Sequence, residues 1–304
     1  MKMVFHAALR VVSAIALFAV AVQAQTVNIS GTRLTYPLVR KWISEFSKDY
    51  PQIKVQITHG APADSIDISI LAFQFDRESV LKTNKEAVVI AQYVQLPIAN
   101  SKRPDLKQLQ SKGFTESDFK KIYFEAKKPT EPQGKAPIVV YKREKPACAA
   151  KSFAQHYGSN ATNAPGIGVS GDDSDLSKAV KNDVNGLSYN NLGFIYNIQT
   201  RLVNDSLAVV PLDLNENGKI DAYEKIYTTL DDVVNFVEKT RHPKIPTDGV
   251  NAIFRKDNPN KNVGIFLQWV LSKGAAFNHE WGFVNPEKEN LAKQQQILKS
   301  NFSN

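Results

Sequence analysis

Residues Thr26–Ile57 read TVNISGTRLTYPLVRKWISEFSKDYPQIKVQI, and this stretch indicates the class of fold. Val27 and Ile29 alternate with polar residues as in a short strand, and residues 53–57 alternate again after a stop at Tyr50–Pro51. The apolar residues between the two strands recur at helical spacing: Leu38, Val39, Trp42, Ile43 and Phe46. The stretch therefore predicts a strand, a loop, a helix and a second strand, which is the basic unit of an α/β protein.

The loop of this unit, residues 30–33, leads directly into the predicted helix. A helix N-terminus carries free backbone N–H groups and a partial positive charge, so it suits an anion. The alternative is an ordinary strand-to-helix connection that binds nothing.

The rest of the chain repeats the alternation of strands and helices. Strands are predicted at 65–73, 86–99, 137–142, 186–196 and 250–255, and helices at 104–110, 115–123, 145–157, 172–181, 230–239, 263–272 and 287–298. This alternation predicts an α/β architecture throughout.

Length and composition fit an ordinary globular protein. The 304 residues are 42% hydrophobic and 22% charged, which suits two domains or one large one. The formal net charge of +8 favours anions in general. The Lys and Arg residues are scattered, without a basic helix interleaved with aromatics, so we expect no nucleic-acid partner.

Residues 1–24 have the features of a secretory signal peptide. Lys2 and Arg10 precede the apolar run of residues 11–22, and Val22 and Ala24 supply small residues for a cleavage site. The run is shorter than the roughly 20 residues that a membrane anchor needs. We expect an exported monomer, periplasmic or secreted, without a membrane span. Loss of Lys2 and Arg10 takes the net charge from +8 to +6.

The chain offers little catalytic chemistry. The spacing of its five histidines is not that of a zinc site: His6, His59, His156, His242 and His279. The sequence also contains no nucleophile elbow, P-loop or dinucleotide fingerprint. We therefore expect that the protein is not an enzyme. The single cysteine, Cys148, cannot form an internal disulfide.

A second motif, DLNENGKIDAYE at residues 213–224, matches the twelve-residue calcium loop of EF-hands. Gly218 stands at the sharp turn and Ile220 at the hydrophobic position. The predicted ligands are Asp213, Asn215, Asn217, the Lys219 carbonyl, Asp221 and a bidentate Glu224. No second loop accompanies it, so we predict a solitary structural calcium site; the alternative is a polar turn without an ion.

Six segments, taken in order, resemble the phosphate-binding proteins of ABC transporters, which are type II periplasmic binding proteins. They are GTRLTYPLVRKWISEF (31–46), YVQLPIANSKRP (93–104), KGFTESDFKKIY (112–123), VYKREKPACAAKSF (140–153), NGLSYNNLGFIY (185–196) and FLQWVLSKGAAFNHEWGFV (266–284). The resemblance covers nearly all of residues 26–298, and it rests on the order and spacing of the segments.

The resemblance implies an α/β fold of two lobes joined by two crossover strands, near residues 88–95 and 245–254. Lobe one would comprise residues 25–93 and 250–304, and lobe two residues 94–249. Such proteins close on a solute by a hinge motion, and an ABC permease is the partner that the resemblance implies.

The resemblance also implies that phosphate or a related anion binds in the cleft between the lobes. The residues that it points to are Gly31, Thr32, Arg33, Leu34, Arg143, Ala147, Cys148 and Ala149. The chain departs from the family pattern in that Ala147–Ala149 stands where the family has Ser-Gly-Thr. After Asp67, Ala72 and Phe73 stand where Ser and Arg are usual.

Two alternatives follow from these departures. Cys148 is either a reactive or metal-binding thiol beside Arg143 or a small apolar residue that fills space. The leading function is a periplasmic solute-binding protein for phosphate or a related anion. The alternative is a secreted, calcium-stabilised interaction protein that reuses the scaffold without binding a small anion.

Overall fold

The computed structural model describes residues 25–73, 77–125, 137–145, 147–162 and 164–302. The predicted signal peptide, residues 1–24, lies outside the described residues. Within the described part of the chain, no helix combines the length and the apolar character that crossing a bilayer requires.

The strands belong to one mixed sheet, whose order is β2-β1-β3-β9-β4-β7-β5-β6, with β8 and β10 paired to β4. Its parallel pairs are β1 with β2 and β3, and β5 with β6 and β7; β4 and β9 are antiparallel to their neighbours. The bounds are β1 Val27–Gly31, β2 Val55–Ile57, β3 Ile68–Leu71, β4 Lys85–Asn100, β5 Val139–Arg143, β6 Ile167–Val169, β7 Gly186–Asn191, β8 Leu207–Val209, β9 Thr247–Arg255 and β10 Phe283–Val284.

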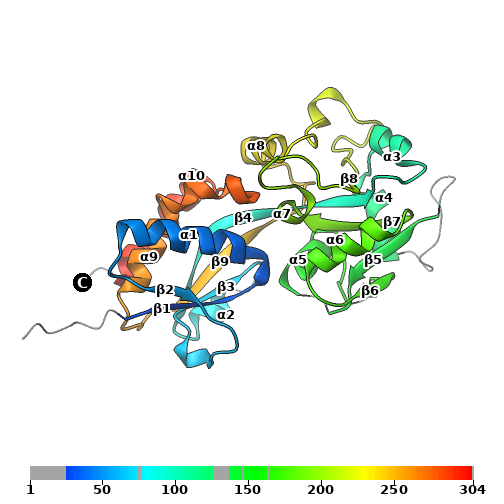
Figure 1. The fold of residues 1–304 in the computed structure, drawn as a ribbon. Coiled ribbons are helices and arrows are strands. Elements are labelled where there is room, and N and C mark those ends of the chain that lie inside the picture. The colour runs from blue at the N-terminus through cyan, green and yellow to red at the C-terminus, as the bar shows by residue number, and fades with distance from the viewer. Residues whose placement is uncertain (1–24, 74–76, 126–136, 146, 163, 303–304) are drawn as a thin grey trace, which may run out of the picture.

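The helices lie on both sides of this sheet (Figure 1). Their bounds are α1 Tyr36–Asp49, α2 Arg77–Leu81, α3 Leu106–Lys112, α4 Glu116–Lys120, α5 Cys148–His156, α6 Asp173–Asn182, α7 Leu192–Ile195, α8 Leu230–Thr240, α9 Asn262–Leu271 and α10 Lys288–Phe302. The α/β class and the two-lobed architecture predicted from the sequence are therefore confirmed.

Two hydrophobic clusters divide the buried residues. One draws on residues 27–93 and 250–298 together with Ala149, and the other on residues 94–245 together with Val284. We call the parts around these clusters lobe one and lobe two; the exact bounds predicted from the sequence stay a prediction. The long strands β4 and β9 run between the two lobes (Figure 1).

The core of lobe one follows from the apolar face of α1. Trp42 and Phe46, one turn apart, are buried, and the Phe46 ring contacts Phe266 and Trp269 of α9 edge-on. The indole N–H of Trp42 donates to the Gly274 carbonyl at 2.9 Å. These contacts fix α1, and with it the loop at its N-terminus, against α9 and the segment that follows it.

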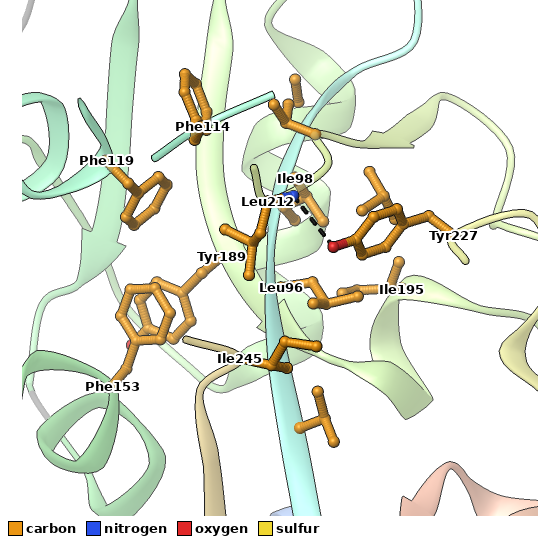
Figure 2. Packing of buried hydrophobic residues seen from close by; sticks show 14 of the residues in the cluster. Leu96, Ile98, Phe114, Phe119, Phe153, Tyr189, Ile195, Leu212, Tyr227 and Ile245 are labelled. Atoms are coloured by element: carbon orange, nitrogen blue, oxygen red, sulfur yellow. Dashed lines mark hydrogen bonds between the residues drawn. The ribbon is translucent and has the colours of Figure 1, made fainter. Parts of the chain in front are cut away.

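Lobe two has an aromatic core that includes Tyr189 of β7 (Figure 2). The rings of Phe153 and Tyr189 stack with their centroids 3.6 Å apart, and Phe119 and Tyr123 pack around Phe153. Aromatic pairs of this kind add to the stability that burial already supplies. Because Phe153 belongs to α5, this packing holds the start of α5 near the end of β5.

One predicted element differs from the structure. Residues 186–196 were expected to form a strand, but β7 ends at Asn191 and Leu192–Ile195 form a helical turn. Leu192 and Ile195, three residues apart, are both buried, which a helical turn allows and an alternating strand does not.

Candidate functional site

A cleft of about 300 Å³ lies between the lobes and brings the predicted anion-binding residues together. Lobe one supplies Gly31, Thr32, Arg33, Leu34 and Leu71, and lobe two supplies Arg143, Ala147, Cys148, Ala149, Ala150, Asp172, Asp173 and Phe194. All eight residues that the sequence pointed to therefore line one cavity.

The wall from lobe one has its backbone groups largely engaged. Thr32 N–H donates to the Ile70 carbonyl at 3.0 Å, and the Tyr36 hydroxyl donates to the Gly31 carbonyl. A Cβ on Gly31 would lie 2.1 Å from the Ile70 carbonyl oxygen, and its φ is +151°, so the close approach of this loop to β3 requires glycine. Thr32 consequently has no free amide to offer a ligand.

Arg143 is the cationic group at the floor of the cleft. It ends β5, and its side chain is only 8% exposed. Its Nε and Nη1 atoms have no hydrogen-bond partner among the described residues, and the Asp173 carboxylate approaches with Oδ1 at 3.7 Å from Nη1. That distance is too long for a hydrogen bond. A buried guanidinium with unused donors is costly, so it is a group that a ligand would satisfy.

The N-terminus of α5 lies beside Arg143 in the same wall. Ala147 is its N-cap and has no side chain that could accept from the first amides. Lys151 N–H donates to the Ala147 carbonyl at 3.1 Å, and the amides before it have no intrahelical acceptor among the described residues. The Gln95 side chain donates to the Ala149 carbonyl at 3.1 Å, which fixes this end of α5 against β4.

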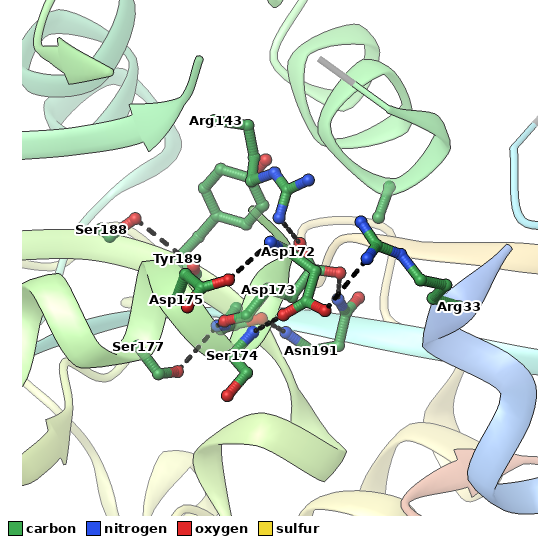
Figure 3. A network of polar contacts seen from close by, with 12 residues as sticks. Arg33, Arg143, Asp172, Asp173, Ser174, Asp175, Ser177, Ser188, Tyr189 and Asn191 are labelled. Carbon is green, nitrogen blue, oxygen red and sulfur yellow. Dashed lines mark hydrogen bonds and ion pairs between the residues drawn. The ribbon is translucent and has the colours of Figure 1, made fainter. Parts of the chain in front are cut away.

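Two aspartates that the sequence analysis missed face these donors (Figure 3). Asp172 caps α6, accepting from Ser174 N–H, and its Oδ2 lies 3.7 Å from Arg33 Nη1. Asp173 begins α6, and Asn191 Nδ2 donates to its Oδ2 at 3.4 Å. Burial raises the pKa of the Asp173 carboxyl, while Arg143 works in the opposite direction.

The remaining predicted residues have simpler surroundings. Cys148 is partly buried against the hydrophobic cluster of lobe one, which suits its interpretation as a space-filling residue. Asp67 does not line the cleft: its carboxylate accepts from Asn28 N–H at 2.8 Å and from Asn258 Nδ2 at 3.2 Å. Asp67 therefore joins β1 to the segment after β9.

The calcium-like loop lies in lobe two, far along the chain from the cleft residues. Asp213 and Glu224 are buried. The Asp213 carboxylate accepts from Asn217 and Gly218 N–H, and the Glu224 carboxylate accepts from Leu214 and Asp221 N–H among others. No group of three or more His, Cys, Asp or Glu side chains in the described residues is arranged to hold a metal ion.

The predicted ligands of this loop nevertheless have the chemistry that calcium prefers, because each of the side chains offers a hard oxygen atom. Each oxygen of the Asp213 carboxylate accepts one backbone N–H, which leaves a lone pair for a cation, whereas Glu224 Oε1 already accepts from Leu214 N–H, Asn215 N–H and the Tyr223 hydroxyl, so an ion would replace some of these contacts. Ile220 packs against Gly113, and its N–H donates to the Ser111 carbonyl at 2.9 Å. The loop thus pairs with the end of α3, where a paired EF-hand would have a second loop.

Comparisons with known proteins place the fold. No protein-family profile matches the chain, and no curated protein is similar to it in sequence. Solved structures match over most of its length. The chain has the fold of a type II periplasmic binding protein.

Three of the similar structures illustrate the match. One from Clostridium perfringens, assigned as a phosphate ABC transporter substrate-binding protein and solved with bound phosphate, is 18% identical, with a TM-score of 0.65 over 86% of this chain and 100% of that one. An ABC-type phosphate transport receptor from Vibrio cholerae is 16% identical, with a TM-score of 0.61 and the same coverage. A possible phosphate-binding protein from Planctomyces limnophilus is 13% identical, with a TM-score of 0.58 over 92% and 99%.

Proposed function

We propose that the protein is an exported solute-binding protein that holds phosphate or a related oxyanion in the cleft between its lobes. The observation that carries this proposal is Arg143, whose buried guanidinium has two nitrogens without an acceptor and opens into the cleft. A tetrahedral oxyanion would accept from Nη2 together with either Nε or Nη1, which are the two forks that a guanidinium offers.

The N-terminus of α5 would complete the anion site. Its free amides and partial positive charge replace, in part, the hydroxyls that Ala147 and Ala149 cannot supply. Arg33 reaches the mouth of the cleft from lobe one, but its side chain is 63% exposed. We assign Arg143 and the α5 amides the main role in binding, and Arg33 a lesser one.

Import through an ABC permease is the transport role that we propose. The fold is shared with substrate-binding proteins of phosphate ABC transporters, and the residues of the cleft come from both lobes. A solute that contacts both walls would favour a closed form, which is the state that a permease would recognise.

We further propose that residues 213–224 bind calcium as a structural ion in lobe two. The order of ligands along the loop and the burial of Asp213 and Glu224 support it. The backbone N–H of Leu212, just before the loop, donates to the hydroxyl of Tyr227, just after it, at 3.1 Å, and this bond joins the two ends of the loop (Figure 2). A calcium ion would therefore stiffen lobe two without touching the solute.

Isothermal titration calorimetry of residues 25–304 with inorganic phosphate tests the proposal, first with calcium and then with a chelator. We expect saturable binding at one site, with micromolar or tighter affinity in the presence of calcium. Absence of heat in both conditions would reject phosphate as the ligand and would favour the interaction protein.

A further inference from the structure

The charges of the cleft point to a more specific ligand than a bare anion. Its lining holds two cationic side chains, Arg33 and Arg143, and two anionic ones, Asp172 and Asp173, so the formal charges of the lining sum to zero. A ligand that carried only negative charge would meet repulsion from the aspartates as well as attraction from the arginines.

The donors and acceptors of the cleft belong to different elements. The donor side consists of Arg143, at the end of β5, and the N-terminus of α5. The acceptor side consists of Asp172 and Asp173, at the start of α6. Arg33 approaches the acceptor side from lobe one, and both Arg–Asp contacts are 3.7 Å long, beyond hydrogen-bonding distance (Figure 3).

The carboxylate of Asp173, on the acceptor side, receives few hydrogen bonds from the protein. The Asp173 side chain is 18% exposed, and its contacts are the 3.4 Å bond from Asn191 and the 3.7 Å approach of Arg143. Asn191, which donates to Asp173, is 2% exposed, and its Oδ1 atom has no hydrogen-bond partner in the described part of the chain. A carboxylate can accept about four hydrogen bonds, so this side of the cleft has room for a strong donor.

The size of the cleft also exceeds the needs of a bare oxyanion. Its volume of about 300 Å³ would hold roughly ten waters at liquid density. A phosphate ion has five non-hydrogen atoms. Leu71 and Phe194 add apolar surface to the lining, against which a short alkyl chain can pack.

We propose that the cleft takes a small zwitterion that joins a phosphorus oxyanion to a protonated amine, such as an aminoalkylphosphonate or a phosphorylated amine. The oxyanion binds Arg143 and the α5 amides, and the ammonium donates to the carboxylates of Asp173 and Asp172. This assignment rests on the proposed anion site, and it adds the two carboxylates as the groups that favour an anion with an attached amine over a bare anion.

The raised pKa of the Asp173 carboxyl is consistent with the assignment. Burial raises the pKa of this carboxyl more than Arg143 lowers it, so its ionised form is incompletely compensated in the free protein. An ammonium group at hydrogen-bonding distance supplies the missing positive charge.

Calorimetric titrations with three probes test the proposal: 2-aminoethylphosphonate, ethylphosphonate and inorganic phosphate. Ethylphosphonate matches the first probe in chain length and phosphonate group but lacks the amine. We expect the amine to strengthen binding roughly ten- to a hundredfold, as a charge-assisted hydrogen bond does. In Asp173→Asn, the ratio of the two phosphonate affinities should fall to within about threefold of one.

The outcomes separate this proposal from the proposed function. If ethylphosphonate or phosphate binds as tightly as the aminophosphonate, the cleft selects for an anion alone and the zwitterion is rejected, while the anion site stands. If none of the three probes binds, both proposals fail. Asp172→Asn is the second variant, because asparagine caps a helix as well as aspartate does. An amine preference that survives in both variants would overturn the assignment of the amine to these carboxylates.

Discussion

Replacing Arg143 by glutamine is the most informative perturbation of the cleft, because this side chain has the unused buried donors. Hydrogen bonds to charged groups contribute about 1.5–3 kcal/mol each. Two nitrogens, Nε and Nη1, are without partners, and glutamine retains one donor group without the charge. We therefore expect Arg143→Gln to weaken phosphate binding by about 3 kcal/mol, or about 150-fold in Kd.

Arg33→Gln is the matched control, since it makes the same chemical change on the opposite wall. The Arg33 side chain is 63% exposed, and its ion pair with Asp172 is 3.7 Å long. An exposed pair of this kind is worth about 0–1 kcal/mol, so the control should weaken binding by less than about fivefold. Titration calorimetry gives both constants, and melting curves check that both variants fold.

The reasoning would be refuted if the two variants lost affinity equally, or if Arg33→Gln lost more. Either result would mean that the anion sits at the exposed mouth of the cleft and not against the end of β5. A loss confined to Arg143→Gln, with an unchanged melting temperature, would assign the buried guanidinium to binding.

Two further predictions concern stability. Calcium at ten to a hundred times its Kd should add about 1.4–2.7 kcal/mol to the free energy of unfolding, so a chelator should lower the melting temperature by roughly 3–10 °C. Glu224→Gln should lose this effect, whereas Glu216→Gln, which lies in the same loop but outside the ligand set, should keep it. An unchanged melting temperature on chelation would contradict the calcium site. Because the folded-state pKa of Asp173 is raised, the folded protein binds more protons there than the unfolded chain just above pH 3.8, so this group makes stability fall as pH rises through that window. Melting curves from pH 4 to 7 should show a smaller pH dependence for Asp173→Asn than for the parent protein, and equal slopes would contradict this origin of the pH dependence.

The fold was predictable from the sequence because its signals are local. Helical spacing of apolar residues marked α1 and α9, and the long, mostly apolar run of residues 86–99 marked β4. Such patterns depend only on which face of an element is buried, and one chain contains them in full.

The resemblance to a family predicted the residues on the donor side of the cleft, but it did not predict the two aspartates that face them. Asp172 and Asp173 follow Gly171 in the sequence SGDDSD, which signals only a turn and a helix cap. Their position against Arg33 and Arg143 depends on how α6 packs beside β5 and β7 and on how the lobes meet. No local pattern encodes that arrangement, although a Gly-Asp-Asp turn before a helix is the signal that deserved testing.

The most direct test of the central claim is to locate the anion. A crystal of residues 25–304 grown with arsenate, a heavier analogue of phosphate, would show the ion by its anomalous scattering. The account predicts one peak in the cleft, within hydrogen-bonding distance of Arg143 Nε or Nη1 and of the first amides of α5. A cleft without a peak at saturating arsenate, or a peak held only by Arg33 at the mouth, would contradict it.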